Sequence, residues 1–571
     1  MERRTDPGAL DALAREYWDT YLEASPLFAT AVGDPRFDDC LPDPTPEGVA
    51  ACRVRFERLL ARVDALDPST LTGPERTTHS ALRESLAADI AERSTGLLDW
   101  NVDPIDGVPA DFLAVPDYQP LETSADAGRM VARWREMARY TDLHLATLRR
   151  SLAEGRVAAR APILRAVAIL EDVLDAPTER WPLLDPIGTL DGLAWSASER
   201  DQFARQLRDV VEREIRPAFI RLHDALVTEV IPASRGEDRP GMCAVPGGPE
   251  GYQHLIRMHT SLDIDAETLH RTGLVEIERI DAELAELGGQ VLGVTGHREA
   301  LRALQGDPRL YFRTREEVYS KAAACLERAA EAAPQWFGRL PLAACEITPM
   351  GAHEEDHVGA AYYRQGAADG SRPGQYVINT SRPETRPHYE AEAMTYHESI
   401  PGHHLQVALG QELGELPAFR RHLGPTAYFE GWGLYAERLA DEMGLYSSQI
   451  DRLGLLSFDA WRAARLVVDT GLHSLGWSRQ QAIDFLLAHT ALSAPSAVDE
   501  VDRYIVLPGQ ALAYKTGQLE LLRLRAEARS VMGHEFDIRE FHDLVLGGGA
   551  LPLPTLASVV SEWAARHPAP A

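Results

Sequence analysis

The clearest chemical signal in the sequence is a His-Glu pair at 397–398, followed by a histidine pair at 403–404. In the H-E-x-x-H pattern, two histidines one helical turn apart bind zinc, and the adjacent glutamate acts as a general base. Here the second histidine position is occupied by Pro401, so the pattern fails as it stands. The grouping still favours a metal site over the alternative, in which the three histidines only cap or pack the helices.

Pro401 and Gly402 offer a way to restore the geometry. Proline cannot donate a hydrogen bond to the carbonyl of His397 and its ring clashes there, so a helix must kink or widen at this point. Gly402 supplies backbone freedom for that distortion. A turn widened by two residues makes His403 the second ligand, which we prefer, whereas an unbroken helix places His404 on the face of His397. The sequence leaves both alternatives open.

A third protein ligand is needed, because a catalytic zinc keeps three protein ligands and one open position. Glu430, 33 residues after His397 and among aromatic residues, is the candidate. Glu437 is seven residues further along the same predicted helical face, where it could hold a ligand histidine by its second ring nitrogen. Glycines on both sides of Trp432 would allow another helix to approach closely. These residues predict a Zn²⁺ ion bound by two histidines and a glutamate.

Other residues fit the remaining roles at such a site. Zinc would polarise a carbonyl group and activate water, and Glu398 would take the proton of that water and pass it to the leaving amine. Residues 502–515 contain two candidates for stabilising the oxyanion, Tyr504 and Tyr514. The same segment contains three candidates for binding a substrate carboxylate: Arg503, Gln510 and Lys515.

Two further segments supply candidates for substrate binding. Asp469 and His473 share a helical face, where they either form an internal hydrogen-bonded pair, which we favour, or present His473 to a substrate. Residues 375–379 fit an edge strand on which an extended substrate adds backbone hydrogen bonds. The candidate contacts on and just after this strand are Tyr376, Asn379 and Arg382.

Apolar residues recur at three- and four-residue spacing through most of the chain, which predicts a mainly α-helical fold. The clearest runs are 10–21, 51–66, 127–155, 198–230, 264–289 and 315–333. Strand character is concentrated in 344–381, where 360–363 and 375–379 are short aromatic or β-branched runs. A loop at 365–374 separates these two runs, which together predict a small antiparallel sheet near the active site.

Segments rich in proline and glycine interrupt the helical pattern. The segment 232–250 is either a boundary between subdomains or a long surface loop, and the two alternatives are equally supported. As a boundary, it separates an N-terminal helical subdomain, 1–240, from a metal-binding catalytic subdomain, 241–571. One continuous domain fits the same pattern.

Composition excludes several classes of protein. The 571 residues are 45% hydrophobic and 25% charged, as in soluble globular proteins. A net charge of −29 argues against a nucleic-acid partner, which needs clustered positive charge. Five scattered cysteines indicate neither a disulfide framework nor a cysteine zinc site. The chain shows no signal peptide and no 18-residue apolar run, so we expect a cytoplasmic protein with no membrane partner.

Seven motifs occur in order along nearly the whole chain: 25–34, 377–380, 397–406, 430–437, 465–473, 503–510 and 549–553. Together they resemble the bacterial DUF885 family, a domain of unknown function grouped with the zincin-like metallopeptidases. The absence of the second histidine of H-E-x-x-H is a trait of that family. The resemblance implies a large helical zincin-like body with the zinc deep in a channel between two helical halves.

We therefore expect a zinc metallohydrolase that cleaves peptide or amide bonds in short peptides or small amino-acid-derived substrates. One alternative is a zinc enzyme of bacterial metabolism or natural-product biosynthesis that acts on a non-peptide substrate. Another is a catalytically inactive, peptidase-like binding protein. The presence of both Glu398 and Glu430 weighs against inactivity, because a decaying site usually loses its base or a ligand first. The sequence assigns no oligomeric state.

Overall fold

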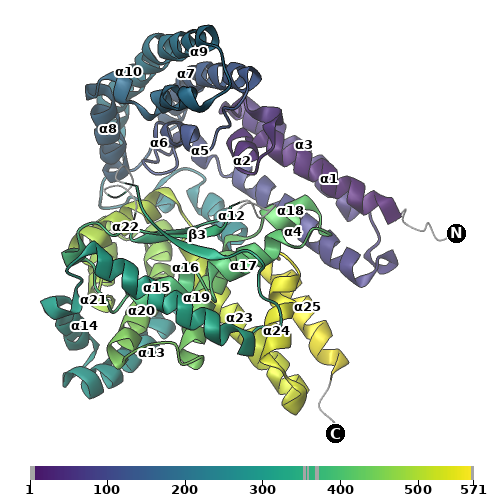
Figure 1. The fold of residues 1–571 in the computed structure, drawn as a ribbon, viewed down its shortest axis with the longest axis vertical. Coiled ribbons are helices and arrows are strands. Elements are labelled where there is room, and N and C mark those ends of the chain that lie inside the picture. The colour runs from purple at the N-terminus through teal and green to yellow at the C-terminus, as the bar shows by residue number, and fades with distance from the viewer. Residues whose placement is uncertain (1–6, 352–354, 356–358, 367–371, 568–571) are drawn as a thin grey trace.

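The computed structural model describes residues 7–351, 355, 359–366 and 372–567 and confirms a mainly helical fold (Figure 1). Each helical run identified in the sequence corresponds to helix in the structure, with ends that differ by a few residues. Residues 367–371 of the predicted loop, and residues 1–6, lie outside the described part. No helix among the described residues has the length and apolar character of a membrane span.

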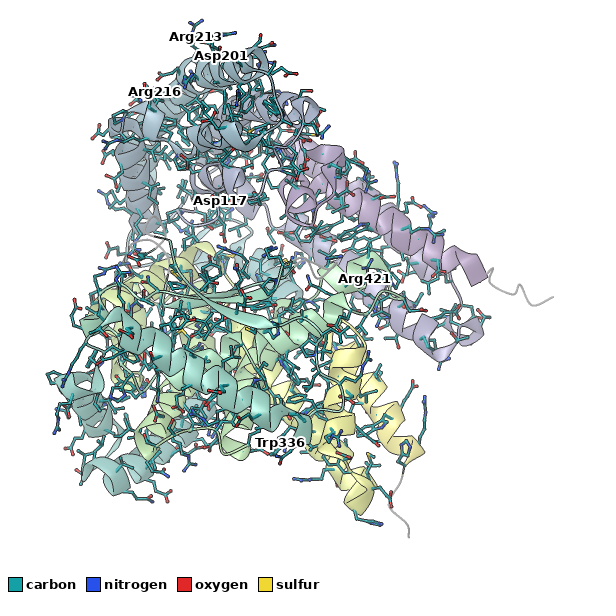
Figure 2. The ribbon with its side chains drawn as sticks, in the orientation of Figure 1. Asp117, Asp201, Arg213, Arg216, Trp336 and Arg421 are labelled. Atoms are coloured by element: carbon teal, nitrogen blue, oxygen red, sulfur yellow. The ribbon has the colours of Figure 1, made fainter. Side chains whose placement is uncertain are left out.

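The N-terminal part of the chain is built from helices. They are α1 (Pro7–Ala24), α2 (Pro26–Ala31), α3 (Pro46–Asp64), α4 (Gly73–Ser94), α5 (Leu97–Trp100), α6 (Ala110–Ala114), α7 (Ser124–Ala153), α8 (Arg160–Asp175), α9 (Ala197–Val210), α10 (Arg216–Ala225) and α11 (Ile231–Ala233). The last three are continuous through two π-helical segments, Val211–Ile215 and Leu226–Val230. Charged side chains such as Asp201 and Arg213 lie on the outer surface of this group (Figure 2).

The middle of the chain contains four α-helices and all three described strands. The helices are α12 (Gly248–Thr260), α13 (Ala266–Leu292), α14 (His297–Gly306) and α15 (Arg315–Ala332). The strands are β1 (Cys345–Pro349), β2 (Ala361–Arg364) and β3 (Gly374–Ile378).

The C-terminal part is again helical. Its helices are α16 (Ala391–Glu398), α17 (His403–Gln411), α18 (Ala418–His422), α19 (Thr426–Glu442), α20 (Gln449–His473), α21 (Arg479–His489), α22 (Ala494–Val506), α23 (Leu512–Met532), α24 (Ile538–Gly547) and α25 (Leu553–Arg566). All the motif residues proposed as metal ligands lie on α16, α17 and α19.

The strands form one sheet in the order β1-β3-β2. Strands β2 and β3 pair antiparallel, as predicted, with Tyr362 opposite Val377. Strand β1 pairs parallel to β3, so the sheet is mixed rather than wholly antiparallel. This order corrects the prediction that residues 375–379 form a substrate-binding edge strand. Because β3 is paired on both sides, its backbone cannot accept a further strand.

Hydrophobic cores cross the predicted boundary at residue 240. One core lies within the N-terminal helices, around Trp134 and Phe219. A second core joins Tyr17 of α1 to Trp432 of α19 and Leu556 of α25. The division at residue 240 therefore does not separate the hydrophobic cores of the chain.

The segment 232–250 is tied to the body on both of its sides. The backbone N–H of Arg235 donates to the carbonyl of Ala158, and its guanidinium donates to the carbonyl of Val157. A Cβ at Gly241 would lie 1.9 Å from the carbonyl oxygen of Leu472, so only glycine allows the chain to pass this close to α20. These contacts describe a packed connection rather than a free linker.

Candidate metal centre

The helix that carries the His-Glu pair ends directly after it. Helix α16 ends at Glu398, and α17 begins at His403. The Trp432 indole N–H donates to the carbonyl of Pro401 at 2.9 Å, which fixes the break against α19. A Cβ at Gly402 would lie 1.9 Å from the carbonyl oxygen of His397. Gly402 is therefore required because the backbone of His397 approaches it too closely for any side chain.

This break brings three metal-binding side chains together. The Nε2 atoms of His397 and His403 lie 3.6 Å and 3.5 Å from Oε2 of Glu430. The two imidazole rings meet edge to face, with their centroids 4.7 Å apart. The three candidate ligand atoms all lie within 4.8 Å of one another. His403 and Glu430 keep some exposure, so solvent reaches the open side of the cluster.

The neighbouring histidine, His404, points elsewhere. Its Nδ1 lies 3.2 Å from the hydroxyl of Tyr363 on β2, and its Nε2 lies 3.1 Å from the carbonyl oxygen of Ala343. Both ring nitrogens are therefore engaged away from His397. The structure favours His403 over His404 as the second ligand, because the interruption at Pro401 removes the continuous helix that would have aligned His404 with His397.

Helix α19 holds His397 from behind. Nδ1 of His397 donates to Oε1 of Glu437 at 2.8 Å, which leaves its Nε2 lone pair directed towards Glu430. A Cβ at Gly433 would lie 2.5 Å from the His397 ring, so this position admits only glycine. Gly431 lies against Gly517 of α23, where an added Cβ would be 2.5 Å from the Cα of Gly517. The two glycines beside Trp432 thus allow one ring and one helix to approach α19.

The cluster fits a zinc ion by its donor set and its spacing. Two imidazoles and a carboxylate are common ligands of catalytic zinc, and two atoms bound to one tetrahedral zinc lie about 3.4 Å apart. The observed separations of 3.6 Å and 3.5 Å are close to that value. The carboxylate of Glu398, adjacent in sequence to His397, adds to the negative charge around the His397 ring.

The electrostatics of these groups favour a bound cation. Burial lowers the pKa of His397, but Glu430, Glu437 and Glu398 outweigh this and raise it to about 10. For Glu430 the balance is the reverse. Burial alone would raise the pKa of this carboxyl group, but the imidazoles of His397 and His403 outweigh burial and hold the pKa well below its usual range. Carboxylates outnumber cationic groups around His397. In such an environment a divalent ion can replace the proton that His397 otherwise binds.

Three of the predicted substrate-side residues form a connected, partly exposed group. The guanidinium of Arg503 donates to Oε1 of Gln510 at 2.9 Å, and the amide of Gln510 reaches the hydroxyl of Tyr514 at 3.4 Å. Tyr514 lies close enough to Glu430 for that carboxylate to raise its pKa, with burial as the larger cause. Tyr514 is therefore the member of this group that lies near the metal-binding cluster, and Gln510 and Arg503 are linked to it by hydrogen bonds.

Two other predicted residues of this segment are committed to internal contacts. The Tyr504 hydroxyl accepts from Arg465 at 2.9 Å and from Trp461 at 3.1 Å, and its side chain is buried. The Lys515 ammonium is 1% exposed and bonds to Asp459 at 2.8 Å, with further contacts to Glu276 and Gln518. These placements correct their predicted roles, since neither side chain is available to an oxyanion or a substrate carboxylate.

The candidates on and after β3 are also held by the protein. The Tyr376 hydroxyl lies 3.4 Å from Oγ1 of Thr395, and it feels the charge of Glu398. The Asn379 side chain is buried, donates to the carbonyl of Glu355 and accepts from Ser381, so it shapes the turn that follows the strand. Arg382 lies on the exposed surface of that turn, with a positive φ of 46°. The contacts described for Asn379 join it to the turn after β3 rather than to the metal-binding cluster.

Sequence reasoning missed two arginines of α20. Arg462 stacks on the rings of Phe458 and Trp461, and its Nη2 lies 3.9 Å from Oε1 of Glu437. Arg465 lies over the Tyr514 ring at 4.3 Å. Both arginines lie one turn apart in a mostly apolar helical run, and this pattern could have identified them from the sequence. A charged residue on a buried helical face usually has a specific partner.

Asp469 and His473 do not form the predicted pair. Asp469 accepts from the Tyr252 hydroxyl at 2.5 Å and from the backbone N–H of Gly509. Nδ1 of His473 instead accepts from the backbone N–H of Met242, and its Nε2 donates to the carbonyl of Tyr504. Both side chains serve the packing of α20, which corrects the pairing and leaves no open face for His473 to meet a substrate.

We expect Asp469→Asn to flatten the pH dependence of stability. Burial raises the pKa of Asp469 to about 7, so its contribution to the free energy of unfolding is complete below pH 4 and is lost as pH rises through 7. The loss amounts to about 1.4 kcal/mol per unit of pKa difference. Urea unfolding at pH 5 and pH 8 measures it. The exposed control Asp484→Asn should keep the wild-type change in the free energy of unfolding between pH 5 and pH 8. The same change in Asp469→Asn as in this control would contradict the assignment.

Comparison with other proteins supports a common fold. The sequence matches a family described as "Bacterial protein of unknown function (DUF885)" over residues 26–560. A crystal structure of a "putative lipoprotein" from Colwellia psychrerythraea is 26% identical, with a TM-score of 0.90 over 98% of this chain and 99% of the other. A "putative lipoprotein of unknown function" from Shewanella oneidensis, 16% identical, has a TM-score of 0.75 over 97% and 99% of the two chains. No curated protein matches.

Proposed function

The chain belongs to the DUF885 family of bacterial proteins, and we propose that it is a zinc-dependent hydrolase acting on peptide or amide bonds of short peptides or small amino-acid-derived substrates. The observation that supports this proposal best is the meeting of His397, His403 and Glu430 across a helix break. Glu398 follows His397 in the sequence, and its charge acts on the His397 ring. The zincin-like relationship and the deep channel remain part of the proposal.

The protein side chains divide the work of hydrolysis between them. A zinc ion bound by His397, His403 and Glu430 would polarise the scissile carbonyl and lower the pKa of water. Glu398 would accept the proton of the attacking water and deliver it to the leaving amine. Tyr514, a partly exposed residue, would donate its hydroxyl proton in a hydrogen bond to the oxygen that gains negative charge.

The arginines beside Tyr514 favour substrates that carry a carboxylate. Within ion-pair distance, Arg465 and Arg503 share a single carboxylate, Glu500. Arg462 adds a third guanidinium, whose Nε and Nη1 find no hydrogen-bond partner in the described part of the chain. This group therefore has more positive than negative charge, and a substrate carboxylate next to the scissile bond would balance it.

Metal removal tests the proposal. Treatment with a chelator should abolish hydrolysis of a library of short peptides and acylated amino acids, and one equivalent of zinc should restore it, because zinc held by His397, His403 and Glu430 would supply the polarisation of the carbonyl. Elemental mass spectrometry of the same samples follows the metal. Hydrolysis that survives complete metal removal would overturn the zinc mechanism, and metal binding without turnover of any amide would favour a binding protein.

The same library tests carboxylate recognition. Each peptide is paired with its C-terminal amide, which differs only in the charge that Arg503 and its neighbours would meet. The free acids should be cleaved with the higher kcat/KM. Equal values for the two members of each pair would mean that these arginines hold the protein together rather than the substrate.

We keep the cytoplasmic setting as part of the proposal. The two solved structures described as lipoproteins suggest a membrane-anchored setting as the alternative for this chain. The proposed chemistry needs only zinc, water and a small substrate, so it is compatible with either compartment. No nucleic-acid or membrane partner is proposed.

A further inference from the structure

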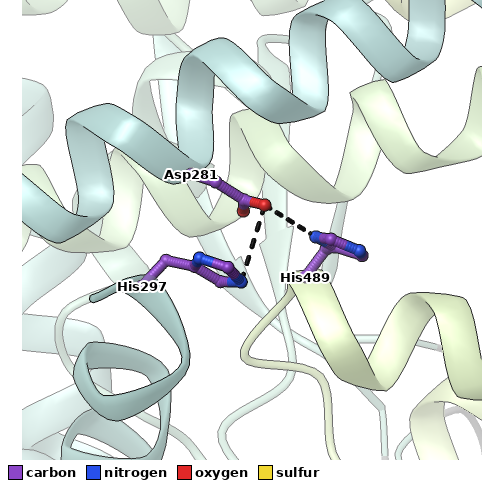
Figure 3. Close-up of side chains that lie close together, drawn as sticks. All are labelled: Asp281, His297 and His489. Carbon is purple, nitrogen blue, oxygen red and sulfur yellow. Dashed lines mark hydrogen bonds and ion pairs between the residues drawn. The ribbon is translucent and has the colours of Figure 1, made fainter.

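A second group of metal-binding side chains lies outside the site described above (Figure 3). Asp281 projects from α13, His297 is the first residue of α14, and His489 is the last residue of α21. Oδ2 of Asp281 lies 2.8 Å from Nδ1 of His489 and 3.5 Å from Nε2 of His297. The three atoms are within 4.8 Å of one another, and none belongs to the first cluster.

Two atoms of this group are buried without a hydrogen-bond partner in the described part of the chain: Nε2 of His297 and Oδ1 of Asp281. The backbone of Ala488 hydrogen-bonds to the His297 ring. Because Nε2 has no partner, this bond uses Nδ1, which therefore carries the proton in the neutral ring. The Nε2 lone pair then faces a carboxylate, an arrangement that repels unless a cation lies between them.

One separation in this group matches those of the first cluster, whereas the 2.8 Å between His489 Nδ1 and Asp281 Oδ2 is a hydrogen bond that a bound ion would replace. The 3.5 Å between His297 Nε2 and Asp281 Oδ2 equals the separation of His403 Nε2 and Glu430 Oε2. It is too long for a hydrogen bond and close to the distance of about 3.4 Å between two ligands of one tetrahedral zinc. Two imidazoles and one carboxylate are the same donor set, suited to zinc among the available divalent ions.

We propose that Asp281, His297 and His489 form a second zinc site, structural in role, that ties the start of α14 and the end of α21 to α13. The side chains are 14–24% exposed, so a water molecule can complete the coordination and the ion can enter. Leu284, Leu301 and Leu486 pack these same helices together beside the group. The ion therefore adds to a core that already exists, and variants of the site should fold.

Metal counting on the full-length chain tests the site. The His397→Ala/His403→Ala protein, which lacks the proposed catalytic ligands, should retain about one zinc per chain, and adding His297→Ala should remove it. A matched control, His223→Ala, alters a surface histidine outside both groups and should leave the count unchanged. If the catalytic site is absent, the wild type itself will carry one zinc and lose it with His297→Ala alone. Retention of that zinc in His297→Ala overturns the second site.

Thermal unfolding gives an independent readout. In the chelator-treated His397→Ala/His403→Ala protein, micromolar ZnCl₂ should raise Tm, because an ion that binds only the folded state stabilises it by mass action. Adding Asp281→Asn, which keeps the size of the side chain, should abolish the shift. A zinc-dependent rise of the same size with and without Asp281→Asn overturns the proposal. Each outcome is read as a difference in Tm on adding zinc, so a small change in basal stability does not obscure it.

Discussion

We expect the Glu398→Gln variant to lose turnover while keeping its zinc. A positioned general base contributes about 10²- to 10⁴-fold, so kcat should fall by about 10³-fold. Metal content should stay at the wild-type value, because the cluster of ligand atoms is formed by His397, His403 and Glu430 without Glu398. Steady-state kinetics on a substrate from the library, together with elemental mass spectrometry, measure both quantities.

Glu437→Gln is the matched control, since it makes the same chemical change behind the metal rather than beside it. Glu437 accepts a hydrogen bond from Nδ1 of His397, so Glu437→Gln should lower the affinity for zinc by about 10- to 100-fold. Saturating zinc should restore turnover in this variant. Two results would contradict the assignment of Glu398. Turnover within tenfold of wild type would exclude it as the base, and loss of zinc from Glu398→Gln would make it a ligand.

The helices could be predicted because their signals are local. Helix α7, for example, begins at a capping box in which Thr123 and Asp126 bond reciprocally, and the apolar period continues from there. The pairing of β1 was not predicted. Its residues, Cys345–Pro349, carry weak strand character, and their parallel pairing with β3 depends on a connection of more than twenty residues. Nothing local in the sequence encodes which strand becomes central.

The core of the site could be predicted for a similar reason. His397 and Glu398 are adjacent, and Glu430 and Glu437 are two turns apart on α19, so helical geometry alone relates the members of each pair. Lys515 shows where this reasoning ends. The sequence suggests that its ammonium binds a substrate carboxylate, yet Asp459 of α20 and Glu276 of α13 enclose it. Such partners come from distant segments, and only packing reveals them.

His403→Ala and His404→Ala should have opposite effects, although the two residues are adjacent. We expect His403→Ala to lose zinc and turnover while staying folded, because one of the three ligands is removed and the ring is partly exposed. His404→Ala should keep its zinc and lose stability by about 1–3 kcal/mol, because it leaves the Tyr363 hydroxyl and the Ala343 carbonyl without their partner.

Metal content and urea unfolding of the two variants, measured in parallel, separate these effects. Pro401 determines which of the two histidines can reach the metal, so the two variants should give clearly different results. With His397 and Pro401 in one unbroken helix, the seven-residue spacing would select His404, whereas the break between Glu398 and His403 selects the nearer histidine. Zinc lost from His404→Ala and retained by His403→Ala would show that the helix closes across Pro401 when the metal binds.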